Sequence, residues 1–224
     1  MTGQRKLKGT PMPPKPKFTK DQIVSVALDI IRDGSVEAIT AQEMGKRLGT
    51  STRPMFTYFD TVEELRQATT DAAWQLYDER IQQGLSFTPA FKGFAMAYIH
   101  FAIEEPSLFR LLFMRKSEAT SIAEFLDREG HLNEVLDAVT DTFHIGHEQA
   151  IWLYENMWTY AHGIAAMCAS EAVGFSDEEI AQKLGVICRG LLMTLRAPAD
   201  ERTAVIPGPD VVMSGSVEGY ADPE

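Results

Sequence analysis

The sequence predicts an all-α protein, and three observations support this prediction. Apolar residues recur at helical spacing in each segment between residues 19 and 196. The segments are separated by glycine, proline or serine, which commonly begin or end helices. No segment shows the sustained alternation of apolar and polar residues that a half-buried strand requires. With 224 residues, 45% of them hydrophobic, the chain is long enough for a small helical domain and a larger one that share a helix.

Residues 1–18 are basic and rich in proline. They contain Arg5, Lys6, Lys8, Lys15 and Lys17 and no acidic residue. Such a segment cannot form a packed core, so we expect a disordered arm in the free protein. Two interpretations carry equal weight: an arm that follows a DNA duplex into a minor groove, and a segment without a role on DNA, either a solvated tail or a cloning remnant.

The first helix is predicted from Thr19 to Asp33. Thr19 and Gln22 have the spacing of a capping box, in which each side chain hydrogen-bonds to the other residue's backbone N–H. Gly34 follows the helix. Its predicted buried face consists of Ile23, Val26, Ala27, Ile30 and Ile31.

Residues 40–59 predict two short helices joined by a tight turn. Thr40 and Glu43 form a second candidate capping box, which begins the first of these helices at Thr40. Met44 and Leu48 lie on its inner face, and Gly49 follows where a left-handed residue would end the helix. Gly49 and Thr50 would then make the turn.

The second helix of this pair is predicted to begin with Ser51 as its cap and Pro54 in its first turn. The expected inward side chains are Met55, Phe56 and Phe59, and the expected outward ones are Thr52, Arg53, Thr57 and Tyr58. Short helices in this arrangement are typical of a helix-turn-helix, whose second helix meets base edges and phosphates in a major groove. An ordinary helical hairpin remains an equally good interpretation of the spacing alone.

A fourth helix is predicted from Asp60, which is paired with Glu63 as a cap, to about Gln83. It carries Leu65, Ala68, Ala72 and Leu76 on one face, with Trp74 and Tyr77 beside them, and links the two domains. Five further helices are expected at about 88–104, 106–115, 117–143, 147–171 and 176–196, or six if Gly130 divides the third. Residues 197–224, rich in Pro, Gly and acids, predict a mobile tail.

The charge is segregated along the chain. Residues 1–59 contain ten Lys or Arg and five acids, a net charge of +5, whereas residues 60–224 contain eleven and twenty-seven, a net charge of −16. This pattern indicates a basic DNA-reading part on an acidic body. Cys168 and Cys188 lie in apolar helical stretches and are expected to be reduced thiols. Without an 18-residue apolar run or a signal peptide, the chain is expected to be cytoplasmic, with no membrane partner.

Catalytic and metal-binding motifs are not found in the sequence. Neither G-x-x-x-x-G-K nor G-x-S-x-G occurs, and the cysteines lack metal-ligand spacing. His144, His147 and Glu148 could share one helical face, but the stretch that starts at His147 lacks the second His of a zinc-protease helix. We therefore expect no catalytic residue, no metal and no cofactor.

A ligand pocket is predicted from aromatic and thioether side chains in the middle of the body. The candidate residues are Phe94, Tyr98, Phe101, Phe109, Phe113, Phe125, Met157, Trp158 and His162. For any single member, a place in the ordinary core is the better interpretation. As a set they predict a site for a small apolar or aromatic effector.

The stretch from Thr19 to Leu65 resembles the DNA-binding domain of the TetR family of transcriptional regulators. The resemblance rests on Gly34, the Thr40-capped helix, G-T-S, and M-F-T-Y-F-D-T-V-E-E-L from Met55, which is similar to the family's V-S-x-x-x-L-Y-x-H-F-x-x-K-E-x-L. Two departures stand out, because Phe56 lacks the hydroxyl of the usual Tyr and Val62 replaces a Lys. The resemblance implies a DNA-binding set of Lys17, Thr40, Lys46, Thr50, Ser51, Thr52, Arg53, Pro54, Thr57 and Tyr58. In this set Arg53 and Thr57 would read bases, while Thr40, Thr52 and Tyr58 would hold phosphates.

A second, weaker resemblance is to a C-terminal domain found in a subset of TetR-type regulators. It rests on P-S-L-F-R-L-L-F-M from Pro106, on Trp158 and on the pair His162-Gly163. It implies a ligand-binding and dimerising body in which the last two helices pair with a second copy of the chain. The apolar stripes expected at that interface are Ile151, Tyr154, Trp158, Ala161 and Ala165, then Ile180, Leu184, Ile187, Leu191 and Leu195.

These observations together predict a helix-turn-helix DNA-binding domain at 19–65 and a helical ligand-binding and dimerisation bundle at 66–196. The resulting hypothesis is a ligand-responsive homodimeric regulator, a repressor according to the resemblance, that binds a palindromic double-stranded operator and is released by its effector. Two alternatives stay open: a helical small-molecule-binding protein without DNA readout, and a helical enzyme of unrecognised chemistry.

Overall fold

The computed structural model describes residues 17–116, 119, 122–127 and 130–197. The described residues form nine α-helices and two 3-10 helices and contain no strand, so the all-α prediction is confirmed. Most of the predicted basic arm, and the predicted tail beyond residue 197, lie outside the described residues. The helices are α1 Lys20–Arg32, α2 Ala41–Arg47, α3 Val62–Leu85, α4 Ala90–Glu104, α5 Pro106–Phe113, α6 Ile122–Asp127, α7 Leu132–Phe143, α8 His147–Ala169 and α9 Asp177–Arg196, with 3-10 helices η1 at Val36–Ala38 and η2 at Met55–Thr57.

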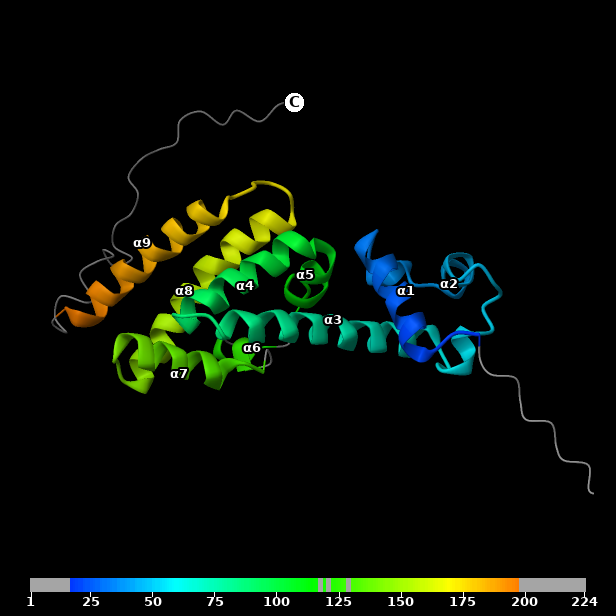
Figure 1. The fold of residues 1–224 in the computed structure, drawn as a ribbon, viewed down its shortest axis with the longest axis horizontal. Helices are drawn as coiled ribbons and strands as arrows, with labels where there is room; N and C mark the ends of the chain where they lie inside the picture. The colour runs from blue at the N-terminus through cyan, green and yellow to red at the C-terminus, as the bar shows by residue number, and fades with distance from the viewer. Residues whose placement is uncertain (1–16, 117–118, 120–121, 128–129, 198–224) are drawn as a thin grey trace, which may run out of the picture.

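We call residues 17–65 the head and residues 66–197 the body. The head lies at one end of the molecule, and α3 runs from it into the body (Figure 1). The predicted capping box of α1 is present, because the Thr19 hydroxyl accepts from the Gln22 N–H at 3.2 Å and the Gln22 side-chain oxygen accepts from the Thr19 N–H at 2.9 Å. The buried hydrophobic side chains of the head are Ile23, Ala27, Leu28, Ile30, Ile31, Val36, Ile39, Met44, Leu48, Met55, Phe59 and Leu65.

The long helix α3 begins one residue later than the sequence predicted. The Thr61 hydroxyl, and not the Asp60 carboxylate, caps it by accepting from the Glu64 N–H at 3.1 Å. The Glu64 carboxylate also accepts from the Asp60 N–H at 2.7 Å. Asp60 lies one residue before the N-cap, so this contact differs from the reciprocal contact of a capping box. A helix of 24 residues is about 36 Å long, enough to belong to both the head and the body.

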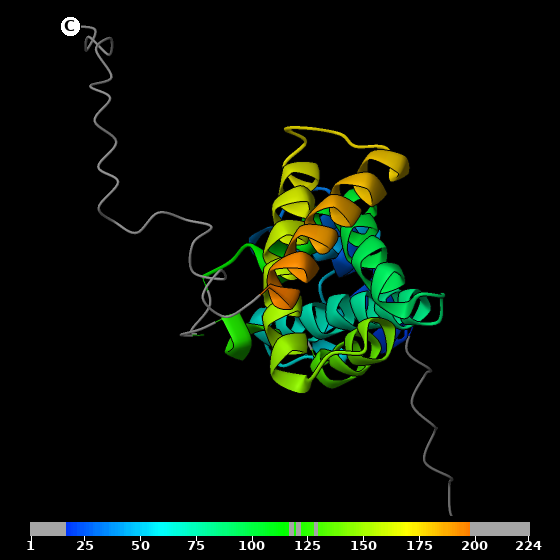
Figure 2. The same ribbon diagram turned by 90° about the vertical axis from the view of Figure 1, so that its left-hand side faces the viewer.

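In the body, α4 packs against both α3 and α8, and α9 packs along α8. Figure 2 shows α8 and α9 side by side. The backbones of α3 and α4 approach closely at Gly84 and Gly93, where a Cβ added to Gly84 would lie 2.6 Å from the Gly93 carbonyl oxygen. The predicted break near Gly130 is present between α6 and α7, and Gly130 has a left-handed φ of +79°. None of the described helices is both long enough and apolar enough to cross a membrane.

Most residues of the two apolar stripes predicted for the dimer interface are not on the surface of the subunit, so their assignment to an interface is wrong. Tyr154, Trp158, Ala161, Ala165, Ile180 and Leu184 are buried inside the subunit, and Ile151, Ile187, Leu191 and Leu195 are half-buried. The reason is that α8 and α9 each use one apolar stripe to pack on their own body. The outer face of these helices instead exposes Met167, Val186 and Met193, the last with 73% of its surface accessible.

Candidate nucleic-acid interface and ligand cavity

Helix α2 and its turn form largely as the sequence predicted. The Thr40 hydroxyl accepts from the Glu43 N–H at 3.1 Å, and Gly49 has a left-handed φ of +60°. The Thr50 N–H closes the turn on the Gly45 carbonyl at 3.0 Å. The reciprocal half of the predicted capping box is wrong, because the Glu43 carboxylate accepts from Arg47 Nε at 2.9 Å instead. The guanidinium of Arg47 lowers the pKa of Glu43.

The second helix of the predicted pair is reduced to one turn, η2. The predicted cap on Ser51 is wrong, since Pro54 occupies the N-cap position of η2 and no side chain caps it. The physical reason is Pro54, which disfavours the α conformation at Arg53 and so prevents a helix from extending towards Ser51. Only six residues then separate Pro54 from Thr61, which caps α3.

The inward face of this segment differs from the prediction at two positions. Met55 and Phe59 are buried as expected, but Phe56 is 47% exposed. Tyr58, predicted to point outward, is half-buried, and its hydroxyl donates to the Phe18 carbonyl at 2.9 Å. The hydrogen that would bind a phosphate oxygen is therefore engaged within the head.

The polar residues predicted to contact DNA fall into two groups by exposure. Lys17, Thr40, Lys46, Ser51, Arg53 and Thr57 are exposed, whereas Thr50, Thr52, Pro54 and Tyr58 are half-buried. Lys46 pairs with Glu43 at 3.5 Å, and the Thr57 hydroxyl donates to the Arg53 carbonyl at 3.2 Å. Among the described residues, no carboxylate lies within 4.0 Å of the Arg53 guanidinium, so this cation is available to an external acceptor.

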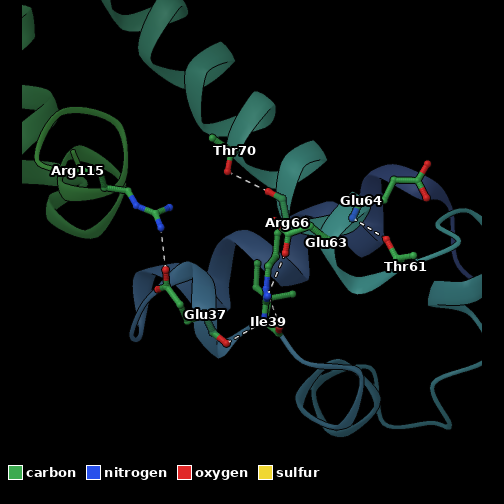
Figure 3. Close-up of polar contacts among 8 residues, drawn as sticks. All are labelled: Glu37, Ile39, Thr61, Glu63, Glu64, Arg66, Thr70 and Arg115. Carbon is green, nitrogen blue, oxygen red and sulfur yellow. Dashed lines mark hydrogen bonds and ion pairs between the residues drawn. The ribbon is translucent and has the colours of Figure 1, made fainter. Parts of the chain in front are cut away.

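A residue that sequence analysis missed, Arg66, ties the head to α3. Its Nε and Nη2 donate to the Ile39 carbonyl at 3.2 and 2.9 Å, and Nη2 also donates to the Glu37 carbonyl at 3.2 Å (Figure 3). Ile39 directly precedes Thr40, the cap of α2. Arg66 therefore links α3 directly to the start of α2. No sequence motif marks this contact, because its partners are backbone carbonyls 27 and 29 residues away.

The head is also tied to α5 and to the chain just after it. Arg32 makes a bidentate contact with Glu105 at 2.7 and 2.9 Å, and this carboxylate raises the pKa of Arg32. The Ser107 hydroxyl donates to the Arg32 carbonyl at 3.1 Å. Arg115 donates to the Glu37 carboxylate at 2.9 Å (Figure 3). Polar contacts thus hold the head against α5 and the residues that flank it, in addition to the contact with α3.

The predicted aromatic set comes together in the body, but as packed core. Trp158 and His162 are stacked with ring centroids 4.8 Å apart, and His162 Nδ1 lies 2.8 Å from the Tyr98 hydroxyl. Burial lowers the pKa of His162. The other predicted rings join through contacts of Phe109 and Phe113 with Tyr98, Phe125 with Trp158, Phe101 with Tyr77 and Phe94 with Tyr154. The cavity beside Tyr98 and Trp158 measures only about 10 Å³, so these side chains fill the space themselves.

A larger cavity of about 260 Å³ lies between α4, α7, α8 and α9. Its lining residues are Pro89, Phe91, Lys92, Ala95, Thr142, Phe143, Met157, Ala181, Leu184, Gly185 and Cys188. Met157 is its one member from the predicted ligand set. No sequence pattern marks this cavity, because its walls combine residues from four separate helices.

Part of the body matches a known protein family. Residues 91–184 match the family model described as the tetracyclin repressor-like C-terminal domain. The chain carries a TetR-type C-terminal domain. This domain extends from Phe91 in α4 to Leu184 in α9 and contains both the aromatic core and most of the cavity wall. The TetR-family assignment made from the sequence is confirmed through this domain, while the resemblance of the head remains a prediction.

Among solved structures, the chain is similar to a TetR variant from Acinetobacter baumannii AYE in complex with minocycline. The two share 14% identity, with a TM-score of 0.47, and the match covers 81% of this chain and 100% of that one. No curated protein matches the chain.

Proposed function

We propose that the protein is a homodimeric, ligand-responsive transcriptional repressor that binds a palindromic operator through its head. One observation carries the proposal: a TetR-type C-terminal domain is joined by the continuous helix α3 to a head with a Thr40-capped helix and a left-handed Gly49 turn. A short helix and a tight turn are the first two parts of a helix-turn-helix.

The exposed polar groups of the head support specific roles on DNA. Arg53, without a carboxylate partner among the described residues, suits a bidentate contact to a guanine edge. Thr57 lies one turn further along and would contact a neighbouring base. Thr40 accepts the Glu43 N–H with its hydroxyl oxygen, which leaves the hydroxyl hydrogen free for a phosphate. Lys17, Lys46, Ser51, Thr50 and Thr52 complete the phosphate-binding set in this proposal.

The homodimer would form through the outer face of α8 and α9. A groove of about 470 Å³ between these helices is lined mainly by apolar and small residues, among them Tyr160, Gly163, Met167, Ile187 and Leu191. A second copy related by a two-fold axis would cover this groove together with Val186 and Met193. Such a dimer places two heads on two half-sites, as a palindromic operator requires.

The effector would act by moving α3 relative to the rest of the body. The clamp from Arg66 to the Ile39 carbonyl carries such motion to Thr40 and α2. A preference of the effector for one head spacing by about 1–3 kcal/mol is enough to change operator affinity about 5- to 150-fold. Operator DNA must then weaken effector binding by the same factor.

A mobility-shift titration with the DNA upstream of the protein's own gene tests this proposal. We expect a saturable complex that survives an excess of unrelated duplex and that forms with an even number of subunits. Equal binding to both duplexes at physiological salt would mean that the head does not read sequence. The alternative of a small-molecule-binding protein without DNA readout would then be the better account.

A further inference from the structure

The cavity between α4, α7, α8 and α9 has one charged lining residue, Lys92, in an otherwise apolar wall. From this arrangement we infer that the cavity binds a small apolar monocarboxylate, with its chain or ring inside and its carboxylate at Lys92. The inference rests on the proposed function in one respect only, namely that this ligand would be the effector. The site and the ligand class can be tested without DNA.

The size of the cavity limits the ligand. A dry cavity of about 150 Å³ accommodates a benzene ring, so a volume of about 260 Å³ holds roughly ten non-hydrogen atoms. Phe91 and Phe143 form one wall, with their ring centroids 6.0 Å apart in an edge-to-face arrangement. Met157 and Leu184, both buried, add flexible apolar surface from α8 and α9. An unbranched or singly ringed hydrocarbon group fits this lining.

The charge of the lining selects an anion. Among the described residues, no carboxylate lies within 4.0 Å of Lys92 Nζ, and none contributes to the cavity wall. Arg80 and His100 line a neighbouring pocket together with Lys92, and both already have acidic partners: Arg80 contacts Glu104, and His100 Nε2 lies 2.8 Å from an Asp177 carboxylate oxygen. Lys92 is exposed, so water solvates its ammonium group when no anion is bound. This positive charge would attract a carboxylate at the cavity and would repel a cation.

The backbone beside Lys92 adds charge of the same sign. Lys92 is the third residue of the 15-residue helix α4, whose first turn has no side-chain cap. The partial positive charge of a helix N-terminus therefore lies next to the Lys92 ammonium group. This contribution reinforces the preference for an anion that Lys92 and the apolar cavity establish.

The position of the cavity also connects it to α3. Lys92 precedes Gly93, and the Gly93 carbonyl lies 2.6 Å from the position that a Cβ of Gly84 would occupy. A ligand held by Lys92 is thus one residue away from the closest crossing of α3 and α4. The aromatic cluster predicted from the sequence has only about 10 Å³ of free space, so the described conformation offers no comparable site there.

Titration calorimetry with octanoate and octanamide tests the ligand class on the full-length protein. The two probes have the same number of non-hydrogen atoms and differ in charge. We expect the unaltered protein to bind octanoate more tightly than octanamide at neutral pH. In Lys92→Met, octanoate affinity should fall by about two- to fivefold, as for a partly exposed ion pair, while octanamide affinity stays within about twofold.

Matched variants separate the charge at this position from net charge and from folding. Lys92→Arg should keep the preference for octanoate. Lys183→Met, which removes the same charge from α9 near Phe175 and away from this cavity, should also keep it. Equal binding of the two probes by the unaltered protein, or the same loss in Lys92→Met and Lys183→Met, would overturn the inference. So would the failure of both probes to bind.

The two cysteines show where the ligand binds. Cys188 lines the cavity, whereas Cys168 does not, and burial raises the pKa of both thiols. At mildly alkaline pH, octanoate should slow alkylation of Cys188 and leave Cys168 unchanged, as followed by mass spectrometry of the peptides. Ala181→Leu, which fills the same cavity, should slow Cys188 alkylation without ligand and abolish octanoate binding. Protection of both thiols or of neither would place the ligand elsewhere and overturn the site.

Operator binding then distinguishes this inference from the proposed function. If octanoate binds with the expected preference but leaves operator affinity unchanged, the site and ligand class stand and the effector role fails. If octanoate does not bind while the operator complex forms normally, the ligand class fails and DNA binding stands.

Discussion

At the scale of single residues, Arg53 and Lys46 provide a matched test of DNA recognition. Both are exposed cations of the head, but Lys46 pairs with Glu43, whereas Arg53 has no carboxylate partner among the described residues. We expect Arg53→Ala to cost about 1–3 kcal/mol on the preferred duplex and to relax preference at one base position. Lys46→Ala should weaken all duplexes alike and reduce the salt slope by about 1. Anisotropy titrations over a set of single-base variants measure both; a uniform loss for Arg53→Ala contradicts its role.

The half-buried imidazole of His162 predicts a pH dependence of stability. Burial lowers the pKa of His162 in the folded protein, while in the unfolded chain it titrates near about 6.5. Near and below that pH the unfolded state binds more protons than the folded state. The free energy of unfolding therefore decreases as the pH is lowered, until the pH lies below the pKa of His162 in the folded protein. His162→Gln removes this titration and should show a smaller loss of stability between about pH 7 and pH 5. Denaturant unfolding across this range measures it, and parallel curves for the two proteins would contradict it.

At the scale of elements, the crossing of α3 and α4 depends on two glycines. In Gly84→Ala the new methyl group would lie 2.6 Å from both the Ala97 Cβ and the Gly93 carbonyl oxygen, so the helices must separate. We expect a loss of about 1–3 kcal/mol in unfolding free energy. Gly190→Ala in α9 meets no atom within 4 Å and should be neutral or stabilising by up to about 1 kcal/mol. Chemical denaturation that finds both variants equally stable would mean that the close crossing is not required.

The elements also show what the sequence could and could not predict. Caps and periodicity place α1 and α2 correctly, because Thr19 and Thr40 hydrogen-bond within three residues of themselves. The start of α3 is shifted by one, because Asp60 and Thr61 compete locally for the same capping role. The shortened η2 follows from Pro54, whose effect on its neighbour is local and predictable. The Arg66 clamp and the 260 Å³ cavity depend on contacts between distant segments, which single-sequence periodicity does not encode.

At the scale of the whole molecule, the exposed apolar residues on the outer face of α8 and α9 lead us to expect that two copies of the chain pair through this face. Val186 is 53% exposed, so Val186→Glu should change subunit stability by less than about 0.5 kcal/mol while placing a charge in the proposed interface. We expect a shift from dimer to monomer in sedimentation and a loss of operator affinity. Asn133→Asp, an added charge at an exposed position of α7, is the control and should remain dimeric. A Val186→Glu variant that stays dimeric at micromolar concentration would move the interface elsewhere.

The close contact with α4 at Gly84 lies near the C-terminal end of α3, so a tilt of α3 about this contact displaces mainly its N-terminal end in the head. Arg66 lies 18 residues before Gly84, which corresponds to about 27 Å along the helix, so a tilt of only about 5° about this crossing displaces the Arg66 end by about 2 Å. Lys92 and the cavity lie next to this crossing, where the same tilt displaces the helices only slightly. Under the proposed mechanism, a ligand that shifted α4 by a small fraction of an ångström against Gly84 would move the Ile39 end by more than the tolerance of a hydrogen bond.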